Sequence, residues 1–417
     1  MITEKPSGSK DLSGVQSIPY RWVMLGLLWL LYASFGIVYR SISPLITPIV
    51  EELHMSYSQM GLVLGSWQLT YIAVAAIAGV VIDRWGIRKS LFFGAIMIAL
   101  SAGLRYFTKG FETFLPIVAL FGIGGPMISI GCPKTIALWF RGKDRGTAVG
   151  IYMTGPWIGG AFVLAATNTV FMPLTGYNWR LTFALYGALT LGVALLWWFL
   201  AREMGPMEEA EGFEIRMLFM RLLKVRNVRI VLISGLLSFC IIHGLTNWLP
   251  KILETRGLSP TLAGLASSTP LLASIPALLI LPRAVPPHLR GRVIALIALL
   301  TGAAAWVLVN SSGFLMYVGL VIFGASGCSV VPLLTLILME TPEVGSRYMG
   351  SAGGIFFCVS EIGGFMGPLA MGTLVDWTGT FLSGAYFVAG IGLCIFGLAL
   401  LLENAPLSET RHLKPET

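Results

Sequence analysis

Long apolar runs alternate with short polar or charged segments along almost the whole chain. A run of about 20 apolar residues is long enough to cross a bilayer as an α-helix. Twelve such runs are separated by charges or turn residues, so the pattern predicts twelve membrane-spanning helices. They cover approximately residues 22–47, 58–82, 90–107, 113–140, 146–172, 180–200, 228–253, 260–284, 292–309, 313–339, 346–375 and 381–402.

Composition agrees with an all-α membrane protein. The 417 residues are 56% hydrophobic and only 12% charged, and the mean hydropathy is +0.81. Soluble globular domains carry about 25% charged residues. The five cysteines lie inside apolar runs, without the spacing of a disulfide framework or a metal site. We therefore expect no metal and no cofactor.

One long polar connection, residues 202–227, divides the apolar chain into two groups of six helices. The expected domains are an N-terminal half (22–201) and a C-terminal half (228–402). Residues 1–21 and 403–417 are expected to be cytoplasmic tails. The first tail is polar and contains acidic residues, which distinguishes it from a cleaved signal peptide.

The two halves repeat each other. MSYSQMGLV from Met55 resembles LSPTLAGLA from Leu258, an offset of 258 − 55 = 203 residues, and GPWIGG from Gly155 has a counterpart in GPLAMG from Gly367. Together with the six-plus-six arrangement, these matches predict an internal duplication. Two pseudo-symmetric halves would then enclose a binding site near the middle of the membrane.

The basic residues indicate how the chain is oriented. Most of the 28 lysines and arginines fall in segments on the same side as the N-terminus. Because positive charge accumulates on the cytoplasmic side, we expect both termini to be cytoplasmic in a multi-pass protein of the cell membrane. The net charge of +8 follows from this topology and does not indicate a nucleic-acid partner. The expected partners are the lipid bilayer and a small molecule, and we expect a monomer.

Arg40 is the strongest candidate for a binding residue, because it is a fixed charge deep within the first apolar run. A charge at that depth costs about 2.5 to 3.5 kcal/mol and usually faces a water-filled cavity or a partner. A guanidinium binds carboxylate or phosphate through two parallel bonds without titrating itself. The alternatives are a salt bridge to Glu361 or an extension of the side chain to the outer headgroups.

His243 is the counterpart of Arg40 in the second half, because the repeat offset of 203 residues joins them. Asn247 lies one helical turn further on the same face. A histidine titrates near neutrality, so it could bind substrate or carry a proton. The alternative is a histidine that is hydrogen-bonded to a carbonyl inside the bundle.

Glu361 and Lys134 are the other charges comparable in depth to Arg40. Burial favours the neutral carboxyl and a nearby arginine favours the carboxylate, so substrate binding to Arg40 could release Glu361 to take a proton. A permanent structural pair is the alternative. Lys134 could line the inner half of the cavity or reach cytoplasmic water. Plausible cavity walls, or packing residues, are Tyr32, Trp67, Gln68, Tyr71 and Tyr152.

The connection between the second and third helices reads GVVIDRWGIRK, which resembles the loop motif of the major facilitator superfamily. Its glycines permit close helix contact and a tight turn, and its acid could pair with basic residues such as Arg145 when the inner gate closes. A plain solvated basic turn is the alternative. The gating residues implied by the resemblance are Gly79, Asp83, Arg84, Gly86, Arg88 and Arg145.

Within that superfamily, residues 122–155 and 247–264 resemble anion:cation symporters and cyanate-permease-like porters. In those families, and in the organophosphate exchangers, an arginine of the first helix binds the acidic group of the substrate. The resemblance implies this role for Arg40. Two positions depart from the symporter pattern: Gly125 stands where a glutamate is common, and Glu361 where an asparagine is frequent.

The combined expectation is a secondary active transporter that moves a small organic anion, a carboxylate, by alternating access with proton coupling. Three alternatives stay open: an exporter of lipophilic drugs by proton antiport, an anion exchanger or facilitator, and a membrane receptor that does not transport. No set of nucleophile and base is visible in the sequence, so an enzyme is not expected.

Overall fold

The computed structural model describes residues 18–203 and 222–402. Both predicted tails, apart from a few residues, and most of the predicted linker lie outside them. The N-terminal half contains α1 (Ile18–Arg40), α2 (Ile46–Leu53), α3 (Tyr57–Trp85), α4 (Ile87–Leu104), α5 (Phe111–Ala119), α6 (Phe121–Trp139), α7 (Gly142–Ala166), α8 (Met172–Leu174) and α9 (Trp179–Leu200). The C-terminal half contains α11 (Arg226–Thr255), α12 (Pro260–Ala284), α13 (Arg290–Asn310), α14 (Gly313–Gly327), α15 (Val330–Glu340), α16 (Gly345–Thr378) and α17 (Leu382–Leu400).

The predicted number of membrane spans is confirmed. Among the described residues, eleven helical segments are long and apolar enough to cross a membrane, and the bent helix α3 brings the number to twelve. Three spans are broken where continuous helices were predicted. The fourth span consists of α5 and α6, the tenth of α14 and α15, and the first ends at Arg40 and continues after a turn as α2.

Prolines explain two of these breaks. A proline has no N–H to bond the carbonyl four residues earlier, and its ring clashes with that carbonyl. Pro44 stands four residues after Arg40, where α1 ends, and Pro332 stands four residues after Cys328, where α14 ends. The prediction that the first helix runs unbroken to residue 47 was therefore wrong. Arg40 lies at the C-terminus of a helix, inside the bundle.

The duplicated sequence segments make equivalent packing contacts. In the N-terminal half, α7 packs against α1, and a Cβ at Gly155 would lie 3.1 Å from the carbonyl oxygen of Trp29. In the C-terminal half, α16 packs against α11, and a Cβ at Gly367 would lie 2.2 Å from the carbonyl oxygen of Cys240. Both glycines belong to the repeated GPWIGG and GPLAMG segments. The two pseudo-symmetric halves are thus evident in the packing.

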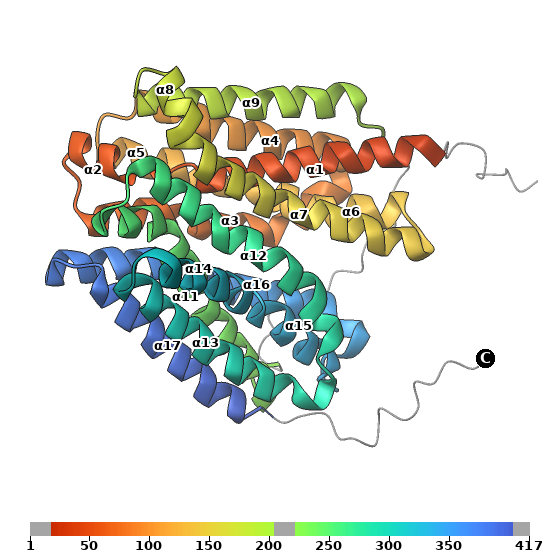
Figure 1. Ribbon diagram of the computed structural model, residues 1–417. Coiled ribbons are helices and arrows are strands. Elements are labelled where there is room, and N and C mark those ends of the chain that lie inside the picture. The colour runs from red at the N-terminus through yellow and green to blue at the C-terminus, as the bar shows by residue number, and fades with distance from the viewer. Residues whose placement is uncertain (1–17, 204–221, 403–417) are drawn as a thin grey trace, which may run out of the picture.

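The halves meet through α3 against α16 and through α7 against α12 (Figure 1). We call the end where α1 begins and α17 ends the terminal end, and the opposite end the distal end. Among the described residues, the hydrogen bonds between the halves lie in the middle of the bundle and at the distal end. Those at the distal end join Thr47 with Lys251 and Glu254, Tyr57 and Ser58 with Asp376, and Asn168 with Pro260 and Thr261.

Candidate functional site

Arg40 bridges the two halves in the middle of the bundle. Its side chain is only 4% exposed, and Nη1 donates hydrogen bonds to Thr246 Oγ1 (2.6 Å) and Asn247 Oδ1 (3.0 Å), both on α11. The guanidinium lies over the Tyr39 ring, 4.3 Å from its centroid. The C-terminus of α1 favours a cation at this point, because the last carbonyls of a helix carry partial negative charge.

Arg40 keeps most of its hydrogen-bonding capacity unused. Within the described residues, its Nε and Nη2 donate no hydrogen bond, and no ion pair joins it to Glu361. The structure therefore shows neither a salt bridge from Arg40 to Glu361 nor an Arg40 side chain that extends out of the bundle toward the outer headgroups. A buried cation without an acid, and with two adjacent N–H donors free, is suited to hold a carboxylate or another oxyanion.

His243 lies beside Arg40 on α11 and is also buried, with 9% of its surface exposed. Its Nδ1 lies 2.7 Å from the Tyr39 hydroxyl and 3.2 Å from Gln68 Nε2. Because both of these groups can donate, Nδ1 acts as the acceptor and the ring hydrogen resides on Nε2. Nε2 bonds to no described residue. With Nδ1 accepting, His243 keeps Nε2–H as a further donor without a partner, and the structure brings the predicted residues Arg40, His243 and Asn247 together.

Glu361 enters the site from α16 and is 8% exposed. Its Oε2 is buried without a hydrogen-bond partner among the described residues. The carboxylate lies close to Gln68, because a Cβ built on Gly364 would lie 2.9 Å from Glu361 Oε2 and 3.3 Å from Gln68 Nε2. A glycine at 364 therefore leaves room for the acid of one half to approach the amide of the other.

Further buried polar atoms in this region have no partner among the described residues, among them Gln68 Oε1, Asn247 Nδ2 and Trp67 Nε1. A buried donor or acceptor left unpaired costs about 1–3 kcal/mol, and native proteins pair most such groups. Unpaired atoms beside a free arginine therefore indicate a site that is completed by a bound molecule.

The aromatic residues predicted as cavity walls form a connected series of rings. Tyr152 stacks on Tyr32 with ring centroids 5.9 Å apart, Tyr32 contacts Phe35, and Phe35 contacts Tyr39. The series ends at His243, whose centroid is 5.7 Å from that of Tyr39.

Trp67 and Tyr71 extend this aromatic wall along α3. The Trp67 ring lies 5.2 Å from Tyr39 and 5.9 Å from Tyr71 between centroids, and the Tyr71 hydroxyl lies 2.7 Å from Ser129 Oγ on α6. One face of the site is therefore aromatic and is contributed by the N-terminal half.

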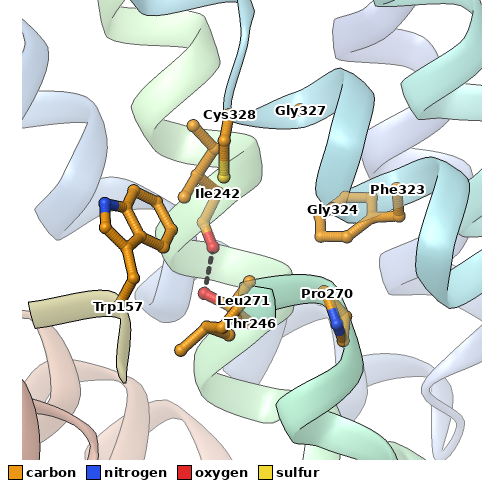
Figure 2. Close-up of a pocket in the computed structure, with 9 residues that line it drawn as sticks. All are labelled: Trp157, Ile242, Thr246, Pro270, Leu271, Phe323, Gly324, Gly327 and Cys328. Carbon is orange, nitrogen blue, oxygen red and sulfur yellow. Dashed lines mark hydrogen bonds between the residues drawn. The ribbon is translucent and has the colours of Figure 1, made fainter. Parts of the chain in front are cut away.

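A small apolar pocket adjoins the site on the side of the C-terminal half (Figure 2). Thr246 lines this pocket and donates to the Ile242 carbonyl, while its hydroxyl also accepts the bond from Arg40. No sequence pattern predicts this pocket, because its other residues are hydrophobic, small or sulfur-containing. They are Trp157, Ile242, Pro270, Leu271, Phe323, Gly324, Gly327 and Cys328.

Lys134 is engaged away from Arg40. It forms an ion pair with Asp83 of the loop motif, and both side chains are partly exposed. Arg145, the expected partner of Asp83, instead donates to the carbonyls of Phe140 (3.0 Å) and Ala137 (2.7 Å). In this conformation, the acid of the loop motif is therefore held by α6, and Lys134 does not contribute its charge to the group around Arg40.

The other residues of the loop motif form the turn between α3 and α4 and one contact to α9. Gly86 has φ of 84°, a left-handed conformation that allows the predicted tight turn between α3 and α4. The close helix contact expected at Gly79 is not made, since a Cβ there would meet no atom within 4 Å. Arg84 is exposed, and Arg88 Nε donates to the Trp198 carbonyl on α9 at 3.1 Å. Arg88 thus connects two helices of one half.

Arg105 is a buried cation that the sequence analysis missed. It follows α4 at the end of an apolar run, where basic residues are usually solvated, yet it is only 1% exposed. Its Nη1 donates to Ser41 Oγ at 2.8 Å and approaches the Val38 carbonyl at 3.5 Å. No acid pairs with it among the described residues. Arg105 thus holds the end of α1 on both sides of Arg40.

We expect Arg105→Lys to weaken anion binding by about tenfold, or 1.4 kcal/mol, because the single ammonium cannot hold both Ser41 and the α1 carbonyl. The test is calorimetric measurement of Kd beside the thermal midpoint of the purified protein. Reduced thermal stability with an unchanged Kd would show that Arg105 only supports the fold and does not position Arg40.

The model of the Major Facilitator Superfamily matches residues 28–368 of this chain. A hexuronate transporter of Bacillus subtilis is 27% identical over 399 residues, which cover 88% of this chain and 91% of that protein. A protein named as a probable sulfoacetate transporter, from Cupriavidus necator, is 25% identical over 440 residues, covering 96% and 100%.

Solved structures of transporters share the fold. A mutant of the nucleoside transporter NupG matches with a TM-score of 0.77 at 14% identity, covering 92% of this chain and 99% of that one. The xylose transporter XylE from E. coli, in an inward open conformation, matches with a TM-score of 0.74 at 16% identity, covering 93% and 97%. At these identities the likeness concerns the fold alone. The match of the family model over most of the chain shows more: this protein belongs to the major facilitator superfamily.

Proposed function

We propose that this protein is a secondary active transporter of a small organic anion, whose acidic group binds Arg40. The observation that carries the proposal is a buried guanidinium without an acid, with Nε and Nη2 unused, in the middle of the bundle between the two halves. The names of the two relatives, a hexuronate and a probable sulfoacetate transporter, support an anionic substrate.

Transport would proceed by alternating access. The bonds between the halves at the distal end hold that end closed in this conformation. With the terminal end cytoplasmic, as the distribution of basic residues predicts, the site would communicate with the cytoplasm of a cell-membrane protein. Arg40 and His243 belong to different halves, so a substrate held by both changes the relative stability of the two conformations.

Proton coupling would depend on Glu361. Among the described residues, Glu361 is the one acidic residue whose side chain is buried. It belongs to α16 and lies close to Gln68 of the other half. Gly125 leaves no acid at the usual position of the fourth span. His243 is less suited to carry the proton, because Nδ1 is occupied and the neighbouring Arg40 charge opposes a second positive charge.

An exporter of lipophilic cations is disfavoured by the same geometry. A cationic drug near Arg40 would meet like charge in a site shielded from water, where the repulsion is stronger than in solution. An anion exchanger or facilitator would use the same arginine without Glu361 as a proton carrier.

A thermal-shift comparison of purified protein tests the proposed function. Galacturonate and sulfoacetate represent anions, galactose a neutral sugar, and tetraphenylphosphonium a lipophilic cation. We expect an anion to raise the thermal midpoint, because a ligand that binds only the folded state stabilises it. Stabilisation by the cation alone would contradict the proposal.

The distal gate gives a separate prediction. Asp376, at the end of α16, accepts bonds from the backbone N–H groups of Tyr57 (3.0 Å) and Ser58 (2.7 Å) and from the Ser58 hydroxyl. It thereby caps the N-terminus of α3 from the opposite half. Asp376→Asn keeps one acceptor oxygen but loses the other and the negative charge that favours a helix N-terminus, together about 1 kcal/mol, so it should raise the population with an open distal end about fivefold.

Hydrogen exchange measured by mass spectrometry checks this prediction. We expect faster exchange in α2 and in the last turn of α11, and no change in the terminal ends of the helices. The matched control is Glu340→Gln, since Glu340 pairs with Arg290 inside one half. Unchanged exchange at the distal end of Asp376→Asn would show that this cap does not hold the gate closed.

A further inference from the structure

The unpaired groups around Arg40 are of both kinds. Gln68 Oε1 and Glu361 Oε2 are acceptors, and Asn247 Nδ2 is a donor; all three are buried without a partner among the described residues. His243 Nε2 is a further donor without a bond. A molecule that satisfies this set must both donate and accept hydrogen bonds, in addition to carrying the negative charge that Arg40 requires.

The cation and the acid of the site lie apart. Arg40 donates hydrogen bonds to Thr246 and Asn247 on α11. Glu361 forms no ion pair with Arg40 and instead lies close to Gln68, next to Gly364. Tyr39, His243 and Gln68 connect the two regions, because the Tyr39 hydroxyl and the Gln68 amide both contact His243 Nδ1. The site therefore has an anion-binding end at Arg40 and an acceptor end at Glu361 and Gln68 Oε1.

We infer that the substrate is a monoanionic, hydroxylated acid. This inference rests on the proposed function and narrows it. The acidic group binds Arg40, and hydroxyl groups at the other end donate to Glu361 Oε2 and Gln68 Oε1. Asn247 Nδ2, at the Arg40 end, donates to the acidic group or to a hydroxyl next to it, and a hydroxyl nearer the acceptor end accepts from His243 Nε2, since a hydroxyl is donor and acceptor at once.

Two other classes of anion fit this arrangement poorly. A second ionised acidic group offers only acceptors, so it would leave Gln68 Oε1 unpaired and bring its negative charge against that carbonyl oxygen. An alkyl or cycloalkyl tail would leave the buried polar groups unpaired, and sites built to bond a hydroxyl reject analogues that lack it. The site should therefore favour a hexuronate, which has one carboxylate and several hydroxyls, over sulfoacetate, which has two acidic groups and no hydroxyl.

Calorimetric binding to the full-length purified protein at one fixed pH tests this. The ligands are galacturonate and glucuronate, cyclohexanecarboxylate as a ring of similar size without hydroxyls, sulfoacetate as the dianion, and galactose without charge. We expect one or both uronates to bind at least about 30-fold more tightly than cyclohexanecarboxylate and sulfoacetate. Galactose should bind no better than cyclohexanecarboxylate.

The outcomes separate the inference from the proposed function. Equal or tighter binding of cyclohexanecarboxylate or sulfoacetate would overturn the inference and leave the anion transporter intact. Binding of galactose as tight as that of the uronates would overturn both, because the charge would then be irrelevant. The absence of binding by every anion in the panel would also overturn both.

Two variants test the acceptor end. Gln68→Met removes the amide at nearly constant size, so uronate affinity should fall about tenfold while that for cyclohexanecarboxylate is unchanged. Ser66→Ala is the matched control on α3, because the Ser66 hydroxyl bonds to the carbonyls of Val63 and Leu115 and to no residue around Arg40. Glu361→Gln replaces a carboxyl oxygen by an amide group that can donate hydrogen bonds to a second acidic group, so it should raise sulfoacetate affinity about fivefold or more. Unchanged ligand preference in both Gln68→Met and Glu361→Gln would overturn the inference.

Discussion

Arg40→Lys is expected to lose about 100-fold in organic-anion affinity, or 2.7 kcal/mol, while the protein still folds and inserts. In the structure, Nη1 is already committed to Thr246 and Asn247, and Nε and Nη2 are left for the substrate. A lysine has one ammonium group. It cannot hold α11 and form two parallel bonds to a carboxylate at the same time.

Calorimetric titration of the variant with the best-binding anion checks this expectation, with size-exclusion chromatography to establish folding. The matched control is Arg180→Lys, because Arg180 pairs with Glu52 within the N-terminal half and contacts none of the residues around Arg40. The control should bind as the wild type does. Wild-type affinity in Arg40→Lys would remove Arg40 as the anchor of the anion.

Glu361→Gln is expected to abolish substrate accumulation driven by a proton gradient, with at least a tenfold loss, and to leave exchange at equal pH intact. A buried carboxylate in a membrane bundle is retained mainly for function. Glu361 has no ion-pair partner among the described residues, so it is free to change protonation as the site fills and empties. Exchange needs no net proton movement and does not require this step.

The measurement is uptake into proteoliposomes under an inward proton gradient, beside counterflow without one. Glu340→Gln serves as the control, because its acid lies at the end of α15 and pairs with Arg290. Undiminished gradient-driven accumulation in Glu361→Gln would exclude it from coupling and direct attention to His243. If the wild type exchanges substrate but never accumulates it, the protein is an exchanger or facilitator.

The twelve spans could be predicted because hydropathy is summed over about 20 residues and tolerates errors at single positions. The approach of Arg40 to His243 and Asn247 could also be predicted, since the repeat offset places Arg40 and His243 at equivalent positions of two symmetric halves. Helix breaks were missed, although Pro44 and Pro332 mark two of them in the sequence.

Partners of charged side chains could not be predicted in the same way. Lys134 and Asp83 are 51 residues apart, and only the packing of α6 against α3 brings them together. Arg105 ends an apolar run, where basic residues are usually solvated; its burial depends on Ser41 and on Phe183, whose ring lies 5.0 Å from the guanidinium. The role of Gln68 follows from its contact with His243, which sequence spacing does not reveal.

Counterflow in proteoliposomes tests the central claim most directly. Vesicles containing the wild-type protein are preloaded with an unlabelled compound, and uptake of labelled galacturonate is followed without any ion gradient. Internal galacturonate should accelerate the uptake of labelled galacturonate severalfold, internal galactose should not, and Arg40→Lys should abolish the acceleration. Exchange of labelled tetraphenylphosphonium, with no counterflow of galacturonate or any other organic anion, would contradict it.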